Sequence, residues 1–435
     1  MKRGTLVLLV SYLVLLCALV VFLSLRGRYP DSRMVWDDDI RREVQAIVEY
    51  RYVDPLDAQR EQQLFDAAMR GYVGELDPFS RYFSAEERPD LDRDTRGEFG
   101  GVGVLVRGDE RGFAVTGVRR DGPAAAAGMR PGSLVTHVDD TELAGKDLNE
   151  MLLLVKGEPG TDVTLRTEFP EDGGTRDLVV TRAVVPLDVV PAVRLIPGEP
   201  AIAYVRVSQF SATTVPRVRE ALQTLVIEQK AEAVVLDLRQ NLGGLVQAAV
   251  DVASFFLPPD SVVCRTHGRT DDTYRTRLDP EYEAVDLPLV VLTDHGTASA
   301  SEILAGALQD HGRAVLVGER TYGKFLVQSL IELTNGDGLV RVTTSRYETP
   351  AGRSAQNDPE REQAGGLLPD LRVPLEGDAR REVFQRFARQ AGPDWELEPG
   401  READEGADPQ LDVAVALIRG GEAPLETVTV MADRR

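Results

Sequence analysis

The stretch that most constrains the fold is residues 289–324. It opens with a short apolar run at 289–293, which predicts a buried strand, and the apolar side chains of 299–309 then follow helical spacing. A second apolar run at 314–318 predicts another strand. The apolar side chains of the expected helix are Ile303, Leu304, Ala307 and Leu308. Strand, turn, helix and strand in this order are typical of an α/β domain.

The same order occurs earlier in the chain. Residues 201–211 predict a strand and residues 214–230 a helix. Residues 233–244 predict a buried strand that ends in a glycine turn, and a further helix follows at 245–257. We therefore expect an α/β core made of repeated strand, turn and helix units.

Three hydroxyl side chains compete for one role at the turn before the 299–309 helix: Thr297, Ser299 and Ser301. A turn between strand and helix holds a side chain at the mouth of an α/β sheet. The first amides of the helix have no partner within it, so they can donate to an oxyanion. This turn is therefore a candidate site for a serine nucleophile.

Lys324 is an unusual residue here, because only five of the 50 basic residues are lysine. Arginine cannot lose its proton in a protein, whereas a lysine among apolar neighbours can do so near neutral pH and act as a base. The next three residues, 325–327, are apolar. A serine at the helix start and this lysine would form a nucleophile and base pair. The alternative from these features alone is a surface lysine with helix-capping serines.

A histidine base fits the sequence less well. No G-x-S-x-G motif is present, and the four histidines are scattered along the chain. His295 and His311 flank the helix, but His311 with Gly312 is typical of a helix C-terminal end.

The motifs around this stretch resemble those of the carboxyl-terminal processing peptidases, or tail-specific proteases (family S41). They are TASASEI at 297–303, ALQD at 307–310, VGERTYGK at 317–324 and a glutamine at 328. In that family the nucleophile is the serine 25 residues before the lysine, and a glutamine four positions later orients the lysine. The resemblance implies Ser299 as nucleophile, Lys324 as base and Gln328 as the orienting residue. It also implies a ClpP/crotonase-like α/β serine peptidase core over residues 186–373.

A second segment of the core, DLRQNLGG at 237–244, resembles the family segment whose last glycine donates an oxyanion amide. From the residues alone, a glycine pair after a strand is equally well explained as turn chemistry. The resemblance implies Gly244 as one donor and the amide of Ala300, just after the nucleophile, as the other. Phe325 and Leu326 depart from the small residues that are common after the family's lysine.

The glycine cluster FGGVGV at 99–104 opens a β-rich module that extends to about residue 185. Its backbone amides can capture a terminal carboxylate while the strand edge pairs with a peptide. The segments at 122–140 and 147–157 resemble the helix, glycine turn, strand and groove-lining helix of PDZ domains. By that resemblance the PDZ domain spans 96–185. The implied peptide-binding residues are Gly101, Val102, Gly103, Val104 and, on the groove-lining helix, Leu153 or a neighbour.

The coupling of this PDZ domain to the active site is left open by one departure from the family. Lys156 stands where several family members have an arginine that makes the connection.

The N-terminus contains one uncharged stretch, residues 5–25, which is long enough to cross a hydrocarbon core of about 30 Å. A cleaved signal peptide is the alternative, but the run exceeds a usual h-region and no A-x-A-like site follows it. We therefore expect residues 1–25 to form a transmembrane signal anchor. The family resemblance implies a single-pass cell-membrane protein whose catalytic part is extracytoplasmic, in the periplasm.

Both ends of the chain carry further helical patterns. Residues 37–50 and 60–74 predict two amphipathic helices within an N-terminal region at 26–95, with apolar stripes that we expect to pack in a core. The following DPFSRYF segment at 77–83 resembles a family segment, and no chemistry is assigned to it. In a C-terminal extension at 374–435, we expect a flexible acidic linker at 394–408 and a packing helix at 409–419.

Composition narrows the partners. The formal net charge of −21 argues against nucleic acid and anionic lipid surfaces. Two cysteines cannot make a disulfide framework. The resemblance implies protein substrates with exposed C-termini and requires no metal or cofactor. An activator or adaptor protein and a homo-oligomer are open alternatives, and a gated resting state is expected.

Together, these features predict a membrane-anchored serine endopeptidase with a multidomain α/β and α+β fold. It would bind C-terminal segments of proteins through the PDZ domain and hydrolyse them with a Ser-Lys-Gln site. The alternative from a different class is a catalytically silent PDZ scaffold of the cell envelope. Retention of Ser299, Lys324, Gln328 and Gly244 argues against the scaffold, since a pure binder would not need all four.

Overall fold

The computed structural model describes residues 38–269, 272–276, 284–334, 338–357, 364–390, 394–398, 407–420 and 429–430. The expected membrane segment at 5–25 lies outside these ranges. Within them, every helix is too short or too polar to cross a membrane. The chain divides into two compact units, Met1–Ala68 and Met69–Arg435, and each is described by itself.

The N-terminal region contains the two expected helices, α2 (Asp38–Arg51) and α3 (Ala58–Gly74). The boundary between the two units falls within α3. The expectation that the apolar stripes of these two helices pack in a core is wrong: Ile40, Val44 and Ile47 of α2 are each more than half exposed, and Leu64 and Tyr72 of α3 are exposed as well. An amphipathic pattern shows which face of a helix can be buried, but it does not show that a partner covers that face.

The core of the second unit is a seven-stranded sheet in the order β10-β11-β12-β15-β16-β19-β21. The five strands from β11 to β19 run parallel, and the two edge strands are antiparallel to them. The strands are β10 (Ala192–Ile196), β11 (Ile202–Arg206), β12 (Ala233–Asp237), β15 (Leu289–Thr293), β16 (Val315–Gly318), β19 (Leu371–Arg372) and β21 (Thr429–Val430). The predicted strands at 201–211, 233–244, 289–293 and 314–318 are therefore confirmed.

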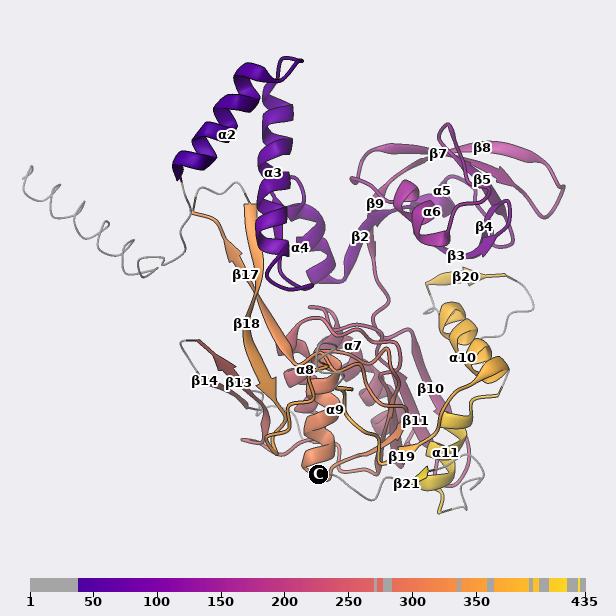
Figure 1. Ribbon diagram of the computed structural model, residues 1–435. Coiled ribbons are helices and arrows are strands. Elements are labelled where there is room, and N and C mark those ends of the chain that lie inside the picture. Colours follow the sequence, from indigo (N-terminus) through magenta and orange to yellow (C-terminus); the bar gives the residue numbers. More distant parts are fainter. Residues whose placement is uncertain are drawn as a thin grey trace, which may run out of the picture. The chain divides into compact units, whose positions relative to one another are not determined.

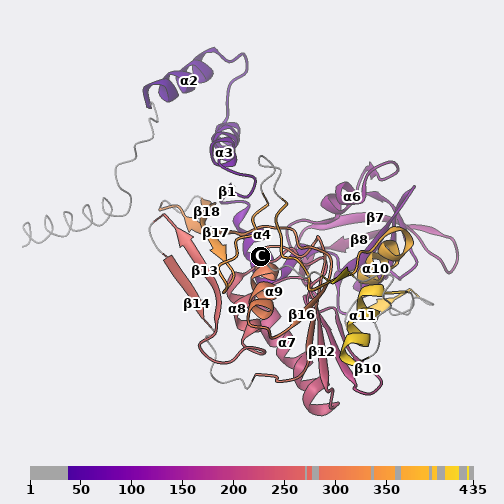
Figure 2. The same ribbon diagram turned by 60° about the horizontal axis from the view of Figure 1, so that its bottom comes forward.

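Helices cover both faces of this sheet (Figure 1, Figure 2). Alternate residues of β12 enter opposite cores, since Val234 packs with the first set of helices and Val235 with α11. This explains why the strand reads as a continuous apolar run. The first set is α7 (Thr214–Leu222) with its π-helical continuation (Gln223–Glu228), α8 (Val246–Ala253) and α9 (Ala300–Asp310), and α11 is Pro409–Ile418.

A second, smaller sheet carries the segment that follows Lys324. Its central strand β18 (Gly338–Glu348) pairs with β17 (Leu326–Glu332) on one side. On the other side it pairs with β1 (Arg81–Ser84) and with β13 (Val262–Gly268), which also pairs with β14 (Asp272–Thr276). Residues far apart in sequence, at 77–84 and 324–332, thus flank the same strand.

The β-rich module has a separate core formed by β3, β4, β5, β7 and β8 with helices α5 and α6. Its elements are β3 (Val104–Asp109), β4 (Gly112–Arg119), α5 (Pro123–Ala126), β5 (Leu134–Val138), β6 (Thr141–Glu142), α6 (Leu148–Val155), β7 (Asp162–Glu168) and β8 (Thr175–Thr181). A two-stranded ribbon of β2 (Glu98–Gly101) and β9 (Ala183–Pro186) connects this module to the rest, and α4 (Arg88–Arg96) precedes it.

The C-terminal extension differs in part from the expected linker. The predicted flexible segment at 394–408 contains a strand, β20 (Trp395–Leu397), which pairs with β4 of the PDZ-like module. Trp395 is buried, so residues 394–398 have an apolar anchor. Helix α10 (Gly377–Arg389) precedes it. The packing role predicted for the 409–419 helix is confirmed, because α11 buries Leu411, Val413 and Ala414.

Candidate active site

Ser299 lies at the first turn of α9 in a backbone conformation that side chains rarely adopt. We call residues 294–299, between β15 and α9, the serine turn. Ser299 has φ 58° and ψ −117°, and it is 9% exposed. A non-glycine residue at positive φ costs free energy and persists where surrounding structure imposes it, often at functional sites. The turn thus presents this one side chain at the end of the sheet.

The hydroxyls of Thr297 and Ser301 are engaged elsewhere. Thr297 Oγ1 donates to Leu238 O at 2.9 Å, and Ser301 Oγ donates to Asn241 O at 2.9 Å. Both side chains are fully buried. Ser299, in contrast, lines a cavity. Of the three hydroxyls that the sequence left in competition, Ser299 is therefore the one placed for chemistry.

Glu302 ties the serine turn to the lysine segment. Its Oε2 accepts from the amides of Ser299 at 2.8 Å and Lys324 at 2.9 Å. Its Oε1 accepts from Thr321 Oγ1 at 2.6 Å and from the amide of Gly323 at 2.8 Å. Burial raises the pKa of this carboxyl, and the four hydrogen bonds oppose that rise. One buried carboxylate therefore fixes the backbone of both candidate catalytic residues.

Lys324 precedes β17, and its amine lies in a sheltered place. Burial lowers the pKa of Lys324, and the positive charge of Arg341 lowers it further, while Asp77 and Glu302 oppose the shift. The Nζ atom lies 4.5 Å from the centroid of the Phe79 ring. The lowered pKa of Lys324 and its main cause, burial, agree with the expected poorly solvated lysine.

Two aromatic residues support the lysine segment from inside the core. Phe325 is fully buried and stacks on Tyr347 with ring centroids 4.5 Å apart. The Tyr347 hydroxyl lies 2.9 Å from Ser299 O and 2.9 Å from Lys324 O, so it can donate to either carbonyl. Phe325, which departs from the family pattern, therefore packs in the core and away from solvent.

The glycine loop, residues 238–245 between β12 and α8, approaches the serine turn closely. Gly243 has φ 102°, and a Cβ there would come within 2.9 Å of Ser299 Cβ. The Gly243 amide donates to Asn241 Oδ1 and the Leu245 amide donates to Phe210 O. The amide between them, that of Gly244, is the candidate oxyanion donor, and Ala300 supplies the first amide of α9.

A buried ion network supports the glycine loop from the other side. Arg239 is fully buried and bonds Asp237 Oδ2 at 2.6 Å and Asp408 Oδ1 at 2.8 Å. Asp408 also pairs with Arg386 at 3.2 Å. The end of the acidic segment and α10 are thereby joined to the strand that carries the loop. Although burial opposes ionisation, Arg239 holds the pKa of Asp408 below its usual value.

The candidate catalytic residues meet in the wall of one cavity of about 230 Å³. Ser299, Lys324, Gln328 and Gly244 all line it. Arg341 also lines it. Gln328 donates from Nε2 to Thr343 Oγ1 at 3.3 Å. Among the described residues, no group of three or more His, Cys, Asp or Glu side chains could hold a metal ion.

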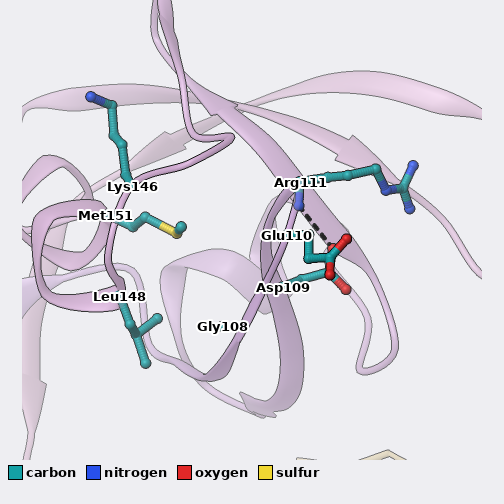
Figure 3. A pocket seen from close by; sticks show the side chains of 7 residues that line it. All are labelled: Gly108, Asp109, Glu110, Arg111, Lys146, Leu148 and Met151. Carbon is teal, nitrogen blue, oxygen red and sulfur yellow. Dashed lines mark hydrogen bonds between the residues drawn. The ribbon is translucent and has the colours of Figure 1, made fainter.

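The PDZ-like module places the predicted carboxylate-binding segment at the turn from β2 into β3. Gly103 has φ 77°, a value that glycine adopts at little cost, and Val102 is buried beneath the turn. Leu153 is 72% exposed, whereas Leu148 and Met151 of α6 line a hollow of about 600 Å³ (Figure 3). The neighbours of Leu153, rather than Leu153 itself, therefore form the apolar wall, because helical spacing turns Leu153 away from them.

The same hollow ends at the turn after β3. Figure 3 shows Asp109, Glu110 and Arg111 at this edge, with the Arg111 amide donating to Asp109 Oδ1 at 3.0 Å. Lys146 borders the hollow on the helix side. Strand β3 and helix α6 are thus the two walls of a groove with charged residues at its far end.

Sequence reasoning missed three residues that organise the site: Glu302, Tyr347 and Arg239. Glu302 follows Ser299 by three positions, which is the spacing of a capping box, so this signal was available. Tyr347 and Arg239 act through tertiary contacts, and no local pattern marks them. Asp310, the last residue of α9, pairs with Arg353.

Comparisons with known proteins agree with this architecture. Residues 201–373 match the family described as Peptidase family S41, and residues 114–168 match the PDZ domain. The carboxy-terminal-processing protease of Bartonella bacilliformis is 32% identical over 376 residues, which cover 83% of this chain and 84% of the relative. The carboxyl-terminal-processing protease of a Picosynechococcus species is 35% identical over 316 residues, or 70% of this chain and 72% of the relative.

A solved structure shares the fold. The putative S41 protease from Bacteroides fragilis has 17% sequence identity and a TM-score of 0.53, and the match covers 90% of this chain and 98% of that one. The fold and the family matches define a serine-type peptidase with an S41 core and a PDZ domain. The chain belongs to the carboxyl-terminal-processing protease family. The resemblance read from the sequence motifs is thereby confirmed.

Proposed function

We propose that this protein is a membrane-anchored serine endopeptidase that uses Ser299 as nucleophile, Lys324 as general base and Gln328 to orient the lysine. The observation that carries the proposal is that these three side chains line one cavity together with Gly244. The catalytically silent scaffold is the alternative. No observation on the described residues favours a scaffold, and a proteolysis experiment distinguishes it from a peptidase.

The chemistry begins with transfer of the Ser299 proton to the neutral amine of Lys324. Ser299 Oγ then attacks the substrate carbonyl, and the oxyanion of the tetrahedral intermediate accepts from the amides of Gly244 and Ala300. Each such donor is worth about 2.7–4 kcal/mol of transition-state stabilisation. Lys324 gives its proton to the leaving amine, and the acyl-enzyme remains on Ser299. Water, activated by Lys324, hydrolyses the ester.

The protonation of Lys324 predicts how activity depends on pH. Burial lowers the pKa of this lysine below that of a free side chain, so the reactive neutral form becomes available at a lower pH. We expect kcat/KM to rise with pH through this pKa and to level off below the range in which an ordinary lysine, at about 10.4, titrates. A pH profile of peptide hydrolysis measures this. A rising limb at the ordinary lysine value would contradict it.

Substrate recognition is assigned to the PDZ domain. Strand β3 has β4 as its described partner, so its other edge can pair with an extended peptide. The amides of residues 101–104 would hold the terminal carboxylate, and upstream residues would lie along the strand toward the hollow between β3 and α6. Leu148 and Met151 favour an apolar side chain there. Protein substrates with exposed, poorly structured C-termini fit this arrangement.

Location and domain limits complete the proposal. Residues 5–25 would anchor the chain in the cell membrane, with the catalytic part extracytoplasmic, in the periplasm. The proposed domain limits are 1–25 for the anchor, 26–95 for the helical region, 96–185 for the PDZ domain, 186–373 for the peptidase core and 374–435 for the extension. We further propose a gated resting state, released by substrate or by an activator or adaptor protein. The ribbon of β2 and β9, which connects the PDZ domain to the peptidase core, supports it.

The test is proteolysis by the full chain in detergent micelles, with an unfolded protein that ends in an apolar C-terminus as substrate. The parent is compared with Ser299→Ala and Lys324→Arg, and with the matched controls Ser261→Ala and Lys230→Arg. We expect cleavage by the parent and both controls and none by the two site variants, because arginine keeps the charge but cannot serve as a base. Silence of every protein, with the substrate C-terminus still bound, would favour the scaffold.

A further inference from the structure

The turn at Asp77–Ser80, which we call the DPFS turn, is a segment to which the sequence assigned no role. Asp77 Oδ1 accepts from the amides of Phe79 and Ser80, each at 2.8 Å. Its Oδ2 accepts from Ser80 Oγ at 2.8 Å. One carboxylate therefore closes the turn with three hydrogen bonds and determines where the Phe79 ring and the Ser80 hydroxyl lie.

The DPFS turn is joined to the strand beside the catalytic lysine segment. Arg341 Nε donates to Phe79 O at 3.1 Å, and the Thr343 amide donates to Ser80 Oγ at 3.1 Å. Both donors belong to β18, whose opposite edge pairs with β17. A bulge in that pairing, between Val327 and Gln328, sets Gln328 opposite Thr343. Bulges of this kind change the direction of a side chain next to an active site.

The hydrogen bonds between the DPFS turn and Gln328 have a defined direction. Burial alone would raise the pKa of Asp77, but the hydrogen bonds from Ser80 and from the Phe79 amide lower it below its ordinary value, so the group is an ionised acceptor. The Ser80 hydroxyl gives its one hydrogen to this carboxylate and therefore accepts from the Thr343 amide, while the Thr343 hydroxyl accepts from Gln328 Nε2. The amide of Gln328 is therefore held with its Oε1 atom free to accept from an amine.

The same turn contacts the amine directly. The Phe79 ring centroid lies 4.5 Å from Lys324 Nζ, within the range of a cation–π interaction. The charged groups that face Lys324 are Asp77 and Glu302, which favour the ammonium form, and Arg341, which opposes it. Asp77 thus acts on the base through its charge and, by way of Thr343, through the orientation of Gln328.

We propose that the DPFS turn is a positioning element of the catalytic base: Asp77, through Ser80 and Thr343, sets the orientation in which Gln328 accepts a hydrogen bond from Lys324, and Phe79 shelters the lysine amine. This inference rests on the proposed peptidase function of the same site. Asp77, Thr343 and Phe79 are positioning residues, since each acts on Lys324 or Gln328 rather than on the substrate.

The first test uses Thr343 in two backgrounds. Thr343→Val removes the hydroxyl at nearly constant shape, and Thr343→Ser keeps it. In the full chain we expect Thr343→Val to lower kcat by about tenfold with KM nearly unchanged, and Thr343→Ser to restore most of the rate. In a Gln328→Ala background the Val substitution should have little further effect, because its target is gone. Equal losses in both backgrounds, or equal losses for Val and Ser, would overturn the proposal.

The second test separates the charge of Asp77 from general damage. Asp77→Asn is compared with Asp139→Asn, whose parent carboxylate also accepts from a backbone amide, that of Thr164, at 2.8 Å. Because Asp77 favours the ammonium form of Lys324, its loss should move the rising limb of the kcat/KM profile to lower pH and reduce the plateau. Asp139→Asn should leave the profile in place. Profiles that coincide for parent and Asp77→Asn would refute the role, and this comparison decides if Thr343→Val does not fold.

Ser299→Ala is measured in the same series to separate the two proposals. Retained activity in Ser299→Ala would refute the peptidase assignment itself. An inactive Ser299→Ala beside a Thr343→Val enzyme of parental rate would refute only the role of the DPFS turn.

Discussion

The glycine loop and the serine turn occupy equivalent places, each between a parallel strand and a helix, but they are held in different ways. The glycine loop has Gln240 at φ 58° and Gly243 at φ 102°, and it is supported by the ion network of Arg239. The serine turn has Ser299 at φ 58° and is supported by Glu302. The first contributes a backbone amide to the site and the second a side chain.

The two elements are therefore sensitive to different kinds of damage. A loop that offers an amide can be glycine-rich, so it must be fixed from outside, here by a network that reaches the C-terminal extension through Asp408. A turn that offers a side chain cannot be glycine at that position, so it bears a strained backbone and is fixed from within by a helix carboxylate. We therefore expect damage to the first support to appear mainly as instability and damage to the second mainly as lost activity.

The largest effect is expected for Arg239→Ala. It leaves the buried carboxylate of Asp237 without the cation that it bonds and leaves Asp408 with Arg386 alone, and breaking a buried pair typically costs about 3–5 kcal/mol of stability. Denaturant unfolding of the full chain measures the loss. As a control, Arg166→Ala breaks the exposed pair with Asp177 and should leave the midpoint nearly unchanged. Similar unfolding midpoints for the two variants would contradict the proposal that Arg239 supports the glycine loop.

The next largest effect is expected for Gly244→Ala, and we expect it in the catalytic rate. A Cβ at Gly244 would lie 2.0 Å from Phe210 O, so the loop must move and take the oxyanion amide with it. We expect kcat to fall by about 10²–10³, as when one oxyanion donor is lost, after correction for the folded fraction. Gly312→Ala is the control, since Gly312 also has a positive φ but open space around it. Equal rates for these two variants would show that the Gly244 amide is not a donor.

Glu302→Gln tests the support of the serine turn. The amide can accept through only one atom, and its NH2 group would face backbone N–H donors, so we expect a loss of about 1.5–3 kcal/mol, expressed mostly in kcat. Because the charge of Glu302 favours the ammonium form of Lys324, the rising limb of the pH profile should also move to lower pH. Glu319→Gln, at a partly exposed pair with Arg380, serves as control. Unchanged kcat in Glu302→Gln would contradict the account.

The smallest effects are expected for Tyr347→Phe and Tyr204→Phe. This pair of variants separates the two supports most clearly. Each removes one buried hydroxyl: the first contacts the carbonyls of Ser299 and Lys324, and the second donates to Asp237 Oδ2 at 2.7 Å. Each should cost about 0.5–1.5 kcal/mol. We expect Tyr347→Phe to lower kcat and Tyr204→Phe to lower stability at constant kcat. A lower stability at constant kcat in Tyr347→Phe, together with a lower kcat in Tyr204→Phe, would contradict the proposed difference between the two loops.

The sequence predicted most of the peptidase core because its strands are buried on both faces and its helices carry apolar stripes. The choice of Ser299 among three hydroxyls came from the family spacing, and the structure adds the physical reason: Thr297 and Ser301 donate to the glycine loop. The contacts of β20 could not be predicted, because its partner strand β4 lies in another domain and far earlier in the chain. The bulge that sets Gln328 opposite Thr343 lies in a local hairpin, but no residue pattern marks its position.

The most direct measurement is covalent labelling of the full chain with a serine-reactive fluorophosphonate, followed by mass spectrometric location of the adduct. The account predicts one adduct, on Ser299, whose rate of formation rises with pH along the kcat/KM profile and which is lost in Lys324→Arg. An adduct on Thr297 or Ser301, or labelling of Ser299 at an equal rate in Lys324→Arg, would contradict the Ser299 and Lys324 assignment.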